Sequence, residues 1–67
     1  MNGLLDLDNI RIMDITGATH VFGVEVIDHY DFEYSPEILR IDFRDYSFVE
    51  FYKRNIISVE VNKKVKE

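Results

Sequence analysis

The sequence predicts an all-β domain, folded as a small, strongly bent antiparallel barrel of five short strands. Apolar and polar residues alternate with a period of two along most of the chain, and no segment sustains the helical period. Turn-forming residues separate the alternating segments at short intervals. Five strands are too few for a sandwich, which uses about seven, and they suit a small barrel. We expect a single domain over residues 1–67, with the barrel at about 9–61 and a charged tail at 62–67 that frays.

Five segments fit the strand pattern, and turn residues bound each of them. In order along the chain they are residues 9–15, 20–34, 38–44, 48–53 and 56–61. Gly17 can supply the positive φ of the first turn, and Pro36 ends the second strand because it lacks the backbone donor that a ladder needs. The inward-facing residues that the alternation predicts are Phe22, Val24, Val26, Leu39, Ile41, Phe43, Val49, Phe51, Ile57 and Val59.

The segment 20–34 carries the longest alternation of the chain. From Phe22 to Tyr34 every even position is apolar or aromatic except Asp28. The segment therefore forms either one long bent strand or two strands joined at a bulge near Asp28. Gly23 is a suitable place for the bend, because a glycine inside a strand pattern often marks one.

The segment 48–53 is apolar on both faces, so Phe48 and Tyr52 lie outside a strand whose other face supplies the core. A core of this size stabilises a lone barrel only marginally. We therefore expect the two rings to be buried against a second copy of the chain. Alternatively, another part of the same chain, either 4–7 or 30–36, covers them.

Composition excludes several classes of protein. The chain has a net charge of −5 and no cysteine, so it holds no disulfide and no zinc site of the usual cysteine-containing kinds. A hydrophobic content of 46% with five phenylalanines and four tyrosines argues against disorder. No apolar run approaches the roughly 20 residues of a membrane helix, and the first residues do not read as a secretory signal. We expect a cytoplasmic protein that does not contact a membrane.

Residues that could carry catalysis are few, and we expect no enzyme, no cofactor and no small-molecule substrate. The three serines lie in no nucleophile elbow and beside no histidine. Asp28, His29 and Asp31 could offer a metal two carboxylates and a nitrogen, but strict alternation turns Asp28 away from the other two. We therefore expect no metal site. A barrel of this length also leaves little room for a pocket.

Two motifs resemble the signatures of the Sm-like family of small barrels. Gly17, Gly23 and Asp28 resemble the first signature, in which a glycine turn is followed by a second glycine and an aspartate. The run 52–58, which begins Tyr-Lys-Arg, is most similar to the second signature of the bacterial Hfq version, with Arg54 in place of a histidine. The resemblance implies an Sm-like or SH3-like barrel whose fourth and fifth strands pair between neighbours into a ring.

Protein binding is the function that the sequence favours. Three aromatic residues alternate with acids after His29, and interfaces are enriched in aromatic anchors within a polar surround. The candidate partner-binding residues are Tyr30, Phe32, Tyr34, Phe48 and Tyr52. We expect a non-enzymatic module that binds protein, copies of itself included, for example as a regulator or inhibitor. Alternatively, the aromatics from Tyr30 to Tyr34 simply continue the core face of their strand.

RNA binding is the alternative function. Residues 1–39 carry eight acids and one base (net −7), whereas residues 40–67 carry seven bases and five acids (net +2). The resemblance implies that Tyr52, Lys53 and Arg54 line a pore for uridine-rich RNA. Cations interleaved with aromatic rings suit a single strand, although a net negative charge opposes phosphate binding. The candidate RNA-binding residues are Arg40, Arg44, Tyr52, Lys53 and Arg54.

Overall fold

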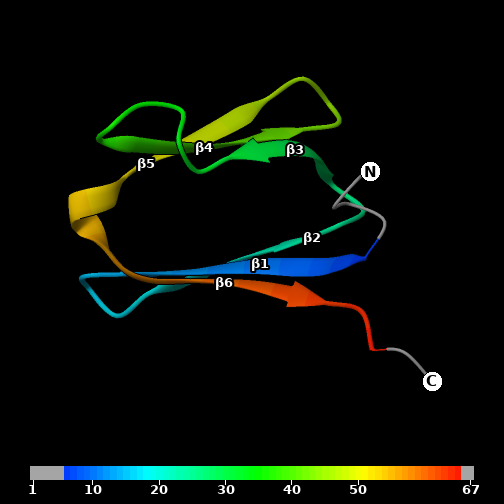
Figure 1. Cartoon of the computed structure of the whole chain (residues 1–67), viewed down its shortest axis with the longest axis horizontal. Coiled ribbons are helices and arrows are strands. Elements are labelled where there is room, and N and C mark those ends of the chain that lie inside the picture. The colour runs from blue at the N-terminus through cyan, green and yellow to red at the C-terminus, as the bar shows by residue number, and fades with distance from the viewer. Residues whose placement is uncertain (1–5, 66–67) are drawn as a thin grey trace.

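The computed structural model describes residues 6–65 and places six strands in two three-stranded antiparallel sheets that face each other (Figure 1). The strands are β1 (Leu7–Asp14), β2 (Thr19–Gly23), β3 (Ile27–Asp31), β4 (Ile38–Phe43), β5 (Phe48–Tyr52) and β6 (Ile56–Lys63). A 3₁₀ turn, η2 (Lys53–Asn55), joins β5 to β6. The strand orders are β2-β1-β6 and β3-β4-β5. The all-β prediction is confirmed, and no closed barrel is found within residues 6–65.

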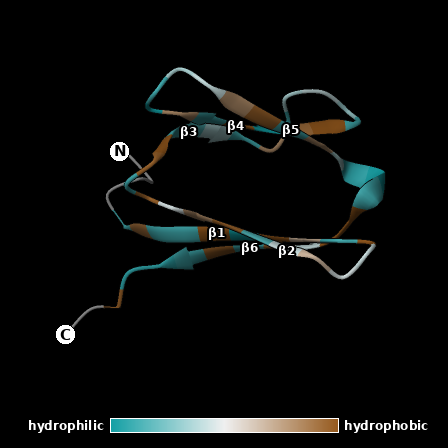
Figure 2. Cartoon of the chain, turned by 180° about the vertical axis from the view of Figure 1, so that it is seen from behind, coloured by the Kyte–Doolittle hydropathy of each residue, from teal (hydrophilic) through white to brown (hydrophobic). Residues whose placement is uncertain are grey.

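Most strand bounds agree with the alternation. Figure 2 shows hydrophilic and hydrophobic residues interspersed along the ribbons of both sheets. Gly17 has a φ of 91° in the β1–β2 turn, as the turn prediction required. The first strand begins at Leu7 rather than residue 9, and Leu7 is fully buried.

The predicted long strand 20–34 is divided between the two sheets. Its first part is β2, its second part is β3, and the backbone turns between them. The N–H of Val26 donates to the carbonyl oxygen of Gly23 (3.1 Å), and that of Ile27 donates to Val24 (3.3 Å). A register shift against β4 then places a bulge at Asp28. Of the two predicted alternatives, two strands rather than one long strand are found, and the bulge at Asp28 is present. The strands are joined by the turn at 24–26, however, and the bulge lies inside β3.

This turn reverses the predicted facing of two residues. Val26, predicted inward, is 44% exposed, whereas Ile27 is fully buried. The turn at 24–26 interrupts the extended backbone, so the alternation restarts with opposite phase at Ile27. The bulge at Asp28 shifts the phase once more, which returns Tyr30 to the core side.

The core is a layer of aliphatic side chains between the two sheets. Its buried members are Leu7, Ile10, Ile12, Ile27, Leu39 and Ile41. The predicted burial of Leu39 and Ile41 is confirmed. Five other predicted core residues are partly buried and pack against this layer: Phe22, Val24, Phe43, Val49 and Phe51.

The predicted burial of the last strand is wrong at Ile57 and Val59, which are 61% and 37% exposed. β6 pairs with β1 through a register shift in which Met13 lies opposite Ser58 and Asp14 opposite Ile56. Ile57 therefore falls in an irregularity of the ladder, without a partner in register, and is pushed outward. Val59 lies opposite buried Ile12, but β6 is the edge of its sheet and leaves this side chain partly open.

The predicted fraying from residue 62 is wrong for the first residues of the tail. β6 continues to Lys63. The side-chain amide of Asn62 donates to the Oδ1 of Asn9 (2.9 Å), and the N–H of Lys64 donates to the carbonyl oxygen of Asp6 (2.7 Å). These bonds continue the pairing of β6 with β1. Residues 66–67 lie outside the described residues.

The phase reversal at the bend makes a prediction about stability. Ile27→Ala removes a fully buried side chain and should lower the free energy of unfolding by about 2–5 kcal/mol, whereas Val26→Ala should lower it by less than about 1 kcal/mol because Val26 is largely in water. Urea unfolding followed by circular dichroism measures both. If the two substitutions lowered the free energy of unfolding equally, or if Val26→Ala lowered it more, the turn at 24–26 would be contradicted.

Candidate functional site

The predicted partner-binding residues divide into a buried group and an exposed group. Tyr30 and Phe32 pack against the core, with their ring centroids 4.9 Å apart, in agreement with the interpretation that they continue the core face. Tyr34, Phe48 and Tyr52 are 50%, 52% and 52% exposed. No part of the described chain therefore covers the two outer rings of β5 fully.

An arginine joins two of the exposed rings into what we call the Arg40 cluster: Tyr34, Arg40 and Phe48. The guanidinium carbon of Arg40 lies 3.8 Å from the centroid of the Phe48 ring and 5.2 Å from that of Tyr34. Both distances are within the range of cation–π attraction. Rings from two separate segments of the chain thus share one cation.

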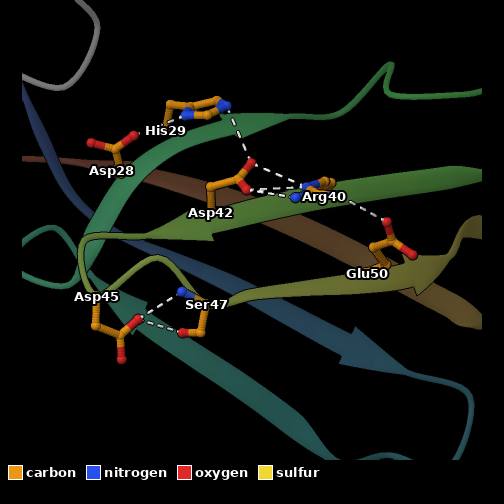
Figure 3. A network of polar contacts seen from close by, with 7 residues as sticks. All are labelled: Asp28, His29, Arg40, Asp42, Asp45, Ser47 and Glu50. Carbon is orange, nitrogen blue, oxygen red and sulfur yellow. Dashed lines mark hydrogen bonds and ion pairs between the residues drawn. The ribbon is translucent and has the colours of Figure 1, made fainter.

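Arg40 is held in place from its other side by two carboxylates (Figure 3). Its Nε and Nη2 donate to Asp42 at 2.9–3.2 Å, and its Nη1 donates to Glu50 at 3.2 Å. Hydrogen bonding to Arg40 lowers the pKa of Asp42 from its usual range, and the same bonds raise the pKa of Arg40. The guanidinium is therefore a fixed part of the surface, with its polar edge already paired.

His29 extends this network to β3. Its Nδ1 lies 3.1 Å from Asp28 and its Nε2 lies 3.1 Å from Asp42 (Figure 3). The expectation that Asp28 points away from His29 is wrong, because the bulge at Asp28 breaks the alternation on which it rested. Within residues 6–65 no group of three or more potential ligands is arranged to hold a metal ion.

The predicted RNA-binding residues do not form one surface. Arg40 is paired with Asp42 and Glu50, as described above. Arg44 lies in the β4–β5 turn, and its Nε donates to the carbonyl oxygen of Ile27 (3.1 Å) at the start of β3. The remaining three, Tyr52, Lys53 and Arg54, gather at η2, which Figure 2 shows as hydrophilic. The guanidinium carbon of Arg54 lies 5.5 Å from the Tyr52 ring centroid.

Two pockets contradict the expectation that the domain has little room for one. A pocket of about 290 Å³, here called the η2 pocket, is lined by Pro36, Glu37, Tyr52, Lys53 and Arg54. The N–H of Lys53 donates to the carbonyl oxygen of Glu37 (2.8 Å), which fixes the turn against the β3–β4 loop. A pocket of about 390 Å³, here called the bend pocket, lies between the 24–26 turn and the β4–β5 turn.

Each sheet has two edge strands. They are β3 and β5 in the sheet β3-β4-β5, and β2 and β6 in the sheet β2-β1-β6. An edge strand presents unpaired N–H and C=O groups to a neighbouring chain. The exposed rings of Phe48 and Tyr52 therefore lie on a strand that can pair with another strand.

Comparison with protein-family models, with curated proteins and with solved structures finds no match for this chain. Among the described residues, no helix is both long and apolar enough to span a bilayer.

The Arg40–Asp42 pair makes a prediction about pH. The pKa of Asp42 is lower in the folded protein than in the unfolded chain, so its charge stabilises the fold at neutral pH, and this stabilisation is lost as the pH falls below about 4. Asp42→Asn should therefore lower the melting temperature at pH 7 and lower it much less at pH 2–3.

Thermal unfolding of both proteins across this range measures the difference. Glu60→Gln is the matched control, because Glu60 lies on the other sheet in an exposed pair with Arg11. If the difference in melting temperature between wild type and Asp42→Asn were the same at pH 7 and at pH 2–3, the charge of the Asp42 carboxylate would contribute nothing to stability.

Proposed function

We propose that this protein is a non-enzymatic binding module that binds protein, second copies of itself included, through β5 and the outer face of its sheet. The observation that carries the proposal is the half-exposure of Phe48 and Tyr52 on an edge strand. Two large rings beside unpaired backbone groups favour association with a neighbouring chain.

The Arg40 cluster adds to this surface. Aromatic residues and arginine dominate the binding energy of protein interfaces. The carboxylates of Asp42 and Glu50 hold Arg40 against the rings before any partner arrives. Association then loses less side-chain entropy than it would with a free arginine.

We also propose that the two sheets belong to a bent barrel of the SH3-like or Sm-like kind. The support is the order of the elements: a bent segment shared between the sheets as β2 and β3, and a 3₁₀ turn just before the last strand. The residues of the resemblance lie at these points. Gly23 ends β2, Asp28 occupies the bulge, and Tyr52 leads into η2.

Self-association makes a prediction about mass in solution. Wild type should exceed the 8.0 kDa of one chain at micromolar concentration, and Phe48→Glu should shift it toward that mass by placing a charge in the contact. Light scattering measures the mass. Val21→Glu is the matched control, because Val21 is equally exposed apolar surface on the other sheet and should leave the assembly intact. A wild type of 8.0 kDa at every concentration would rule out the self-association.

RNA binding is a second candidate, favoured by the η2 pocket. Its walls include all three residues that the Sm-like resemblance assigns to RNA: Tyr52, Lys53 and Arg54. A base could stack on Tyr52 while the two cations contact phosphate. The pairing of Lys53 with Glu33, at 3.6 Å, would have to be exchanged for that contact.

This candidate predicts that a uridine-rich RNA binds at low salt and dissociates as salt rises. Tyr52→Ala should weaken binding by about 1–3 kcal/mol, the contribution of one stacked base. Tyr46→Ala is the control, because Tyr46 is an exposed tyrosine in the β4–β5 turn, outside the η2 pocket. Fluorescence anisotropy measures the affinity, and absence of binding at low salt would remove the RNA function.

A further inference from the structure

The bend pocket lies where two turns of the chain are bonded together. The N–H of Arg44 donates to the carbonyl oxygen of Val26 (3.0 Å), and its Nε donates to that of Ile27 (3.1 Å). The β2–β3 turn and the β4–β5 turn are thereby held as opposite walls of one cavity of about 390 Å³. Its lining residues are Phe22, Glu25, Val26, Phe43, Arg44, Asp45 and Ser47.

Two aromatic rings form part of the wall. The centroids of Phe22 and Phe43 lie 5.5 Å apart, with their planes inclined at 41°. Both rings are only partly buried by the core, so each contributes surface to the cavity. The faces of aromatic rings carry partial negative charge and attract cations, most strongly those that are weakly hydrated.

Two carboxylates complete the wall. Glu25 folds back against Gly23, so that its Oε2 lies 2.6 Å from where a Cβ on Gly23 would be. Within residues 6–65, Glu25 has no cationic partner within ion-pair distance. Asp45 is held in the β4–β5 turn by the N–H of Ser47 (3.0 Å), and hydrogen bonds from Ser47 lower the pKa of Asp45, which keeps it charged.

The lining therefore has two negative charges and one positive charge beside apolar rings. The one positive charge belongs to Arg44, whose Nε is bonded to the backbone of Ile27. An anion would meet two carboxylates and one guanidinium, whereas a cation would meet the same charges, which sum to −1, and two aromatic rings. A methylated ammonium group also displaces water from the apolar wall. Because methyl groups take the place of its N–H groups, it leaves few or no donors without a hydrogen bond when it is buried.

We propose that the bend pocket binds a methylated ammonium group, carried either by a free amine of the choline type or by a methylated lysine of a partner. This goes beyond the protein binding proposed for β5, because the pocket lies between the two turns and uses neither Phe48 nor Tyr52.

The experiment titrates the whole protein with choline and, separately, with 3,3-dimethylbutan-1-ol, which has the same shape without the charge. Choline should shift the amide NMR signals of residues 23–27 and 43–47 and bind about fivefold to thirtyfold more tightly than the alcohol. Equal binding of the two, or no saturation by choline up to about 100 mM, would overturn the proposal.

Variants locate the binding. Glu25→Gln, at an exposed turn position, should weaken choline binding about fivefold, while Glu60→Gln on the other sheet should leave it unchanged. Gly23→Ala should also weaken it, because the added methyl group displaces the flexible Glu25 carboxylate at little cost to the fold. An affinity for choline that none of the pocket variants changes would overturn the assignment to this pocket.

A second arm distinguishes the two sources. A short glycine-serine peptide with one trimethyllysine is compared with free choline and with the same peptide carrying unmodified lysine. If the trimethylated peptide binds more tightly than both free choline and the unmodified peptide, a protein partner is supported. If the trimethylated peptide and choline bind equally, a free amine is supported. A preference for unmodified lysine would overturn the methylated ammonium as the ligand.

Discussion

The bend at residues 24–28 is the constraint on which the rest of the structure depends. One alternating segment has to serve both sheets, so the backbone turns at 24–26 and bulges at Asp28. The two irregularities each shift the alternation, and together they restore it for β3. Between the two irregularities, Ile27 points into the core, while its sequence neighbours Val26 and Asp28 are exposed. A straight strand here would bury Val26 and expose Ile27.

The polar surface of the second sheet follows from the register of its three strands. Pairing of β4 with β5 places Arg40 opposite Glu50 and Asp42 opposite Phe48. Arg40 can therefore contact a carboxylate and an aromatic ring at the same time, and Asp42 on its own strand supplies the second carboxylate. The bulge brings Asp28 beside His29, which reaches Asp42 from β3. The exposed rings of Tyr34 and Phe48 thus contact a cation that two carboxylates hold in place.

The alternation of apolar and polar residues in the sequence predicts those features that depend on it alone. The all-β class, the two faces of β5 and the exposure of Phe48 and Tyr52 depend only on which residues alternate along a single strand. The facing of Val26 and Ile57 was predicted wrongly, because a turn or a bulge changes which face a residue lies on without a clear change in composition. Val59 lies opposite buried Ile12 as predicted, but its place on an edge strand leaves it partly exposed. At Ile57 the shift arises from pairing with Met13 and Asp14, far away in sequence. The Arg40 cluster and both pockets likewise depend on register and on turns that meet only in the folded chain.

β5 connects the features to which we assign binding. The bend pocket lies beside the turn before it, the η2 pocket follows its last residue, and its free edge lies between them. Five residues of strand span about 17 Å, so a chain paired along this edge would pass close to both pockets. The rings of Phe48 and Tyr52 lie on the outer face of the sheet, whereas Phe22 and Phe43 pack from the core side. Occupation of the edge therefore leaves the aromatic wall of the bend pocket free, and the two kinds of binding can be separated by variants that touch only one of them.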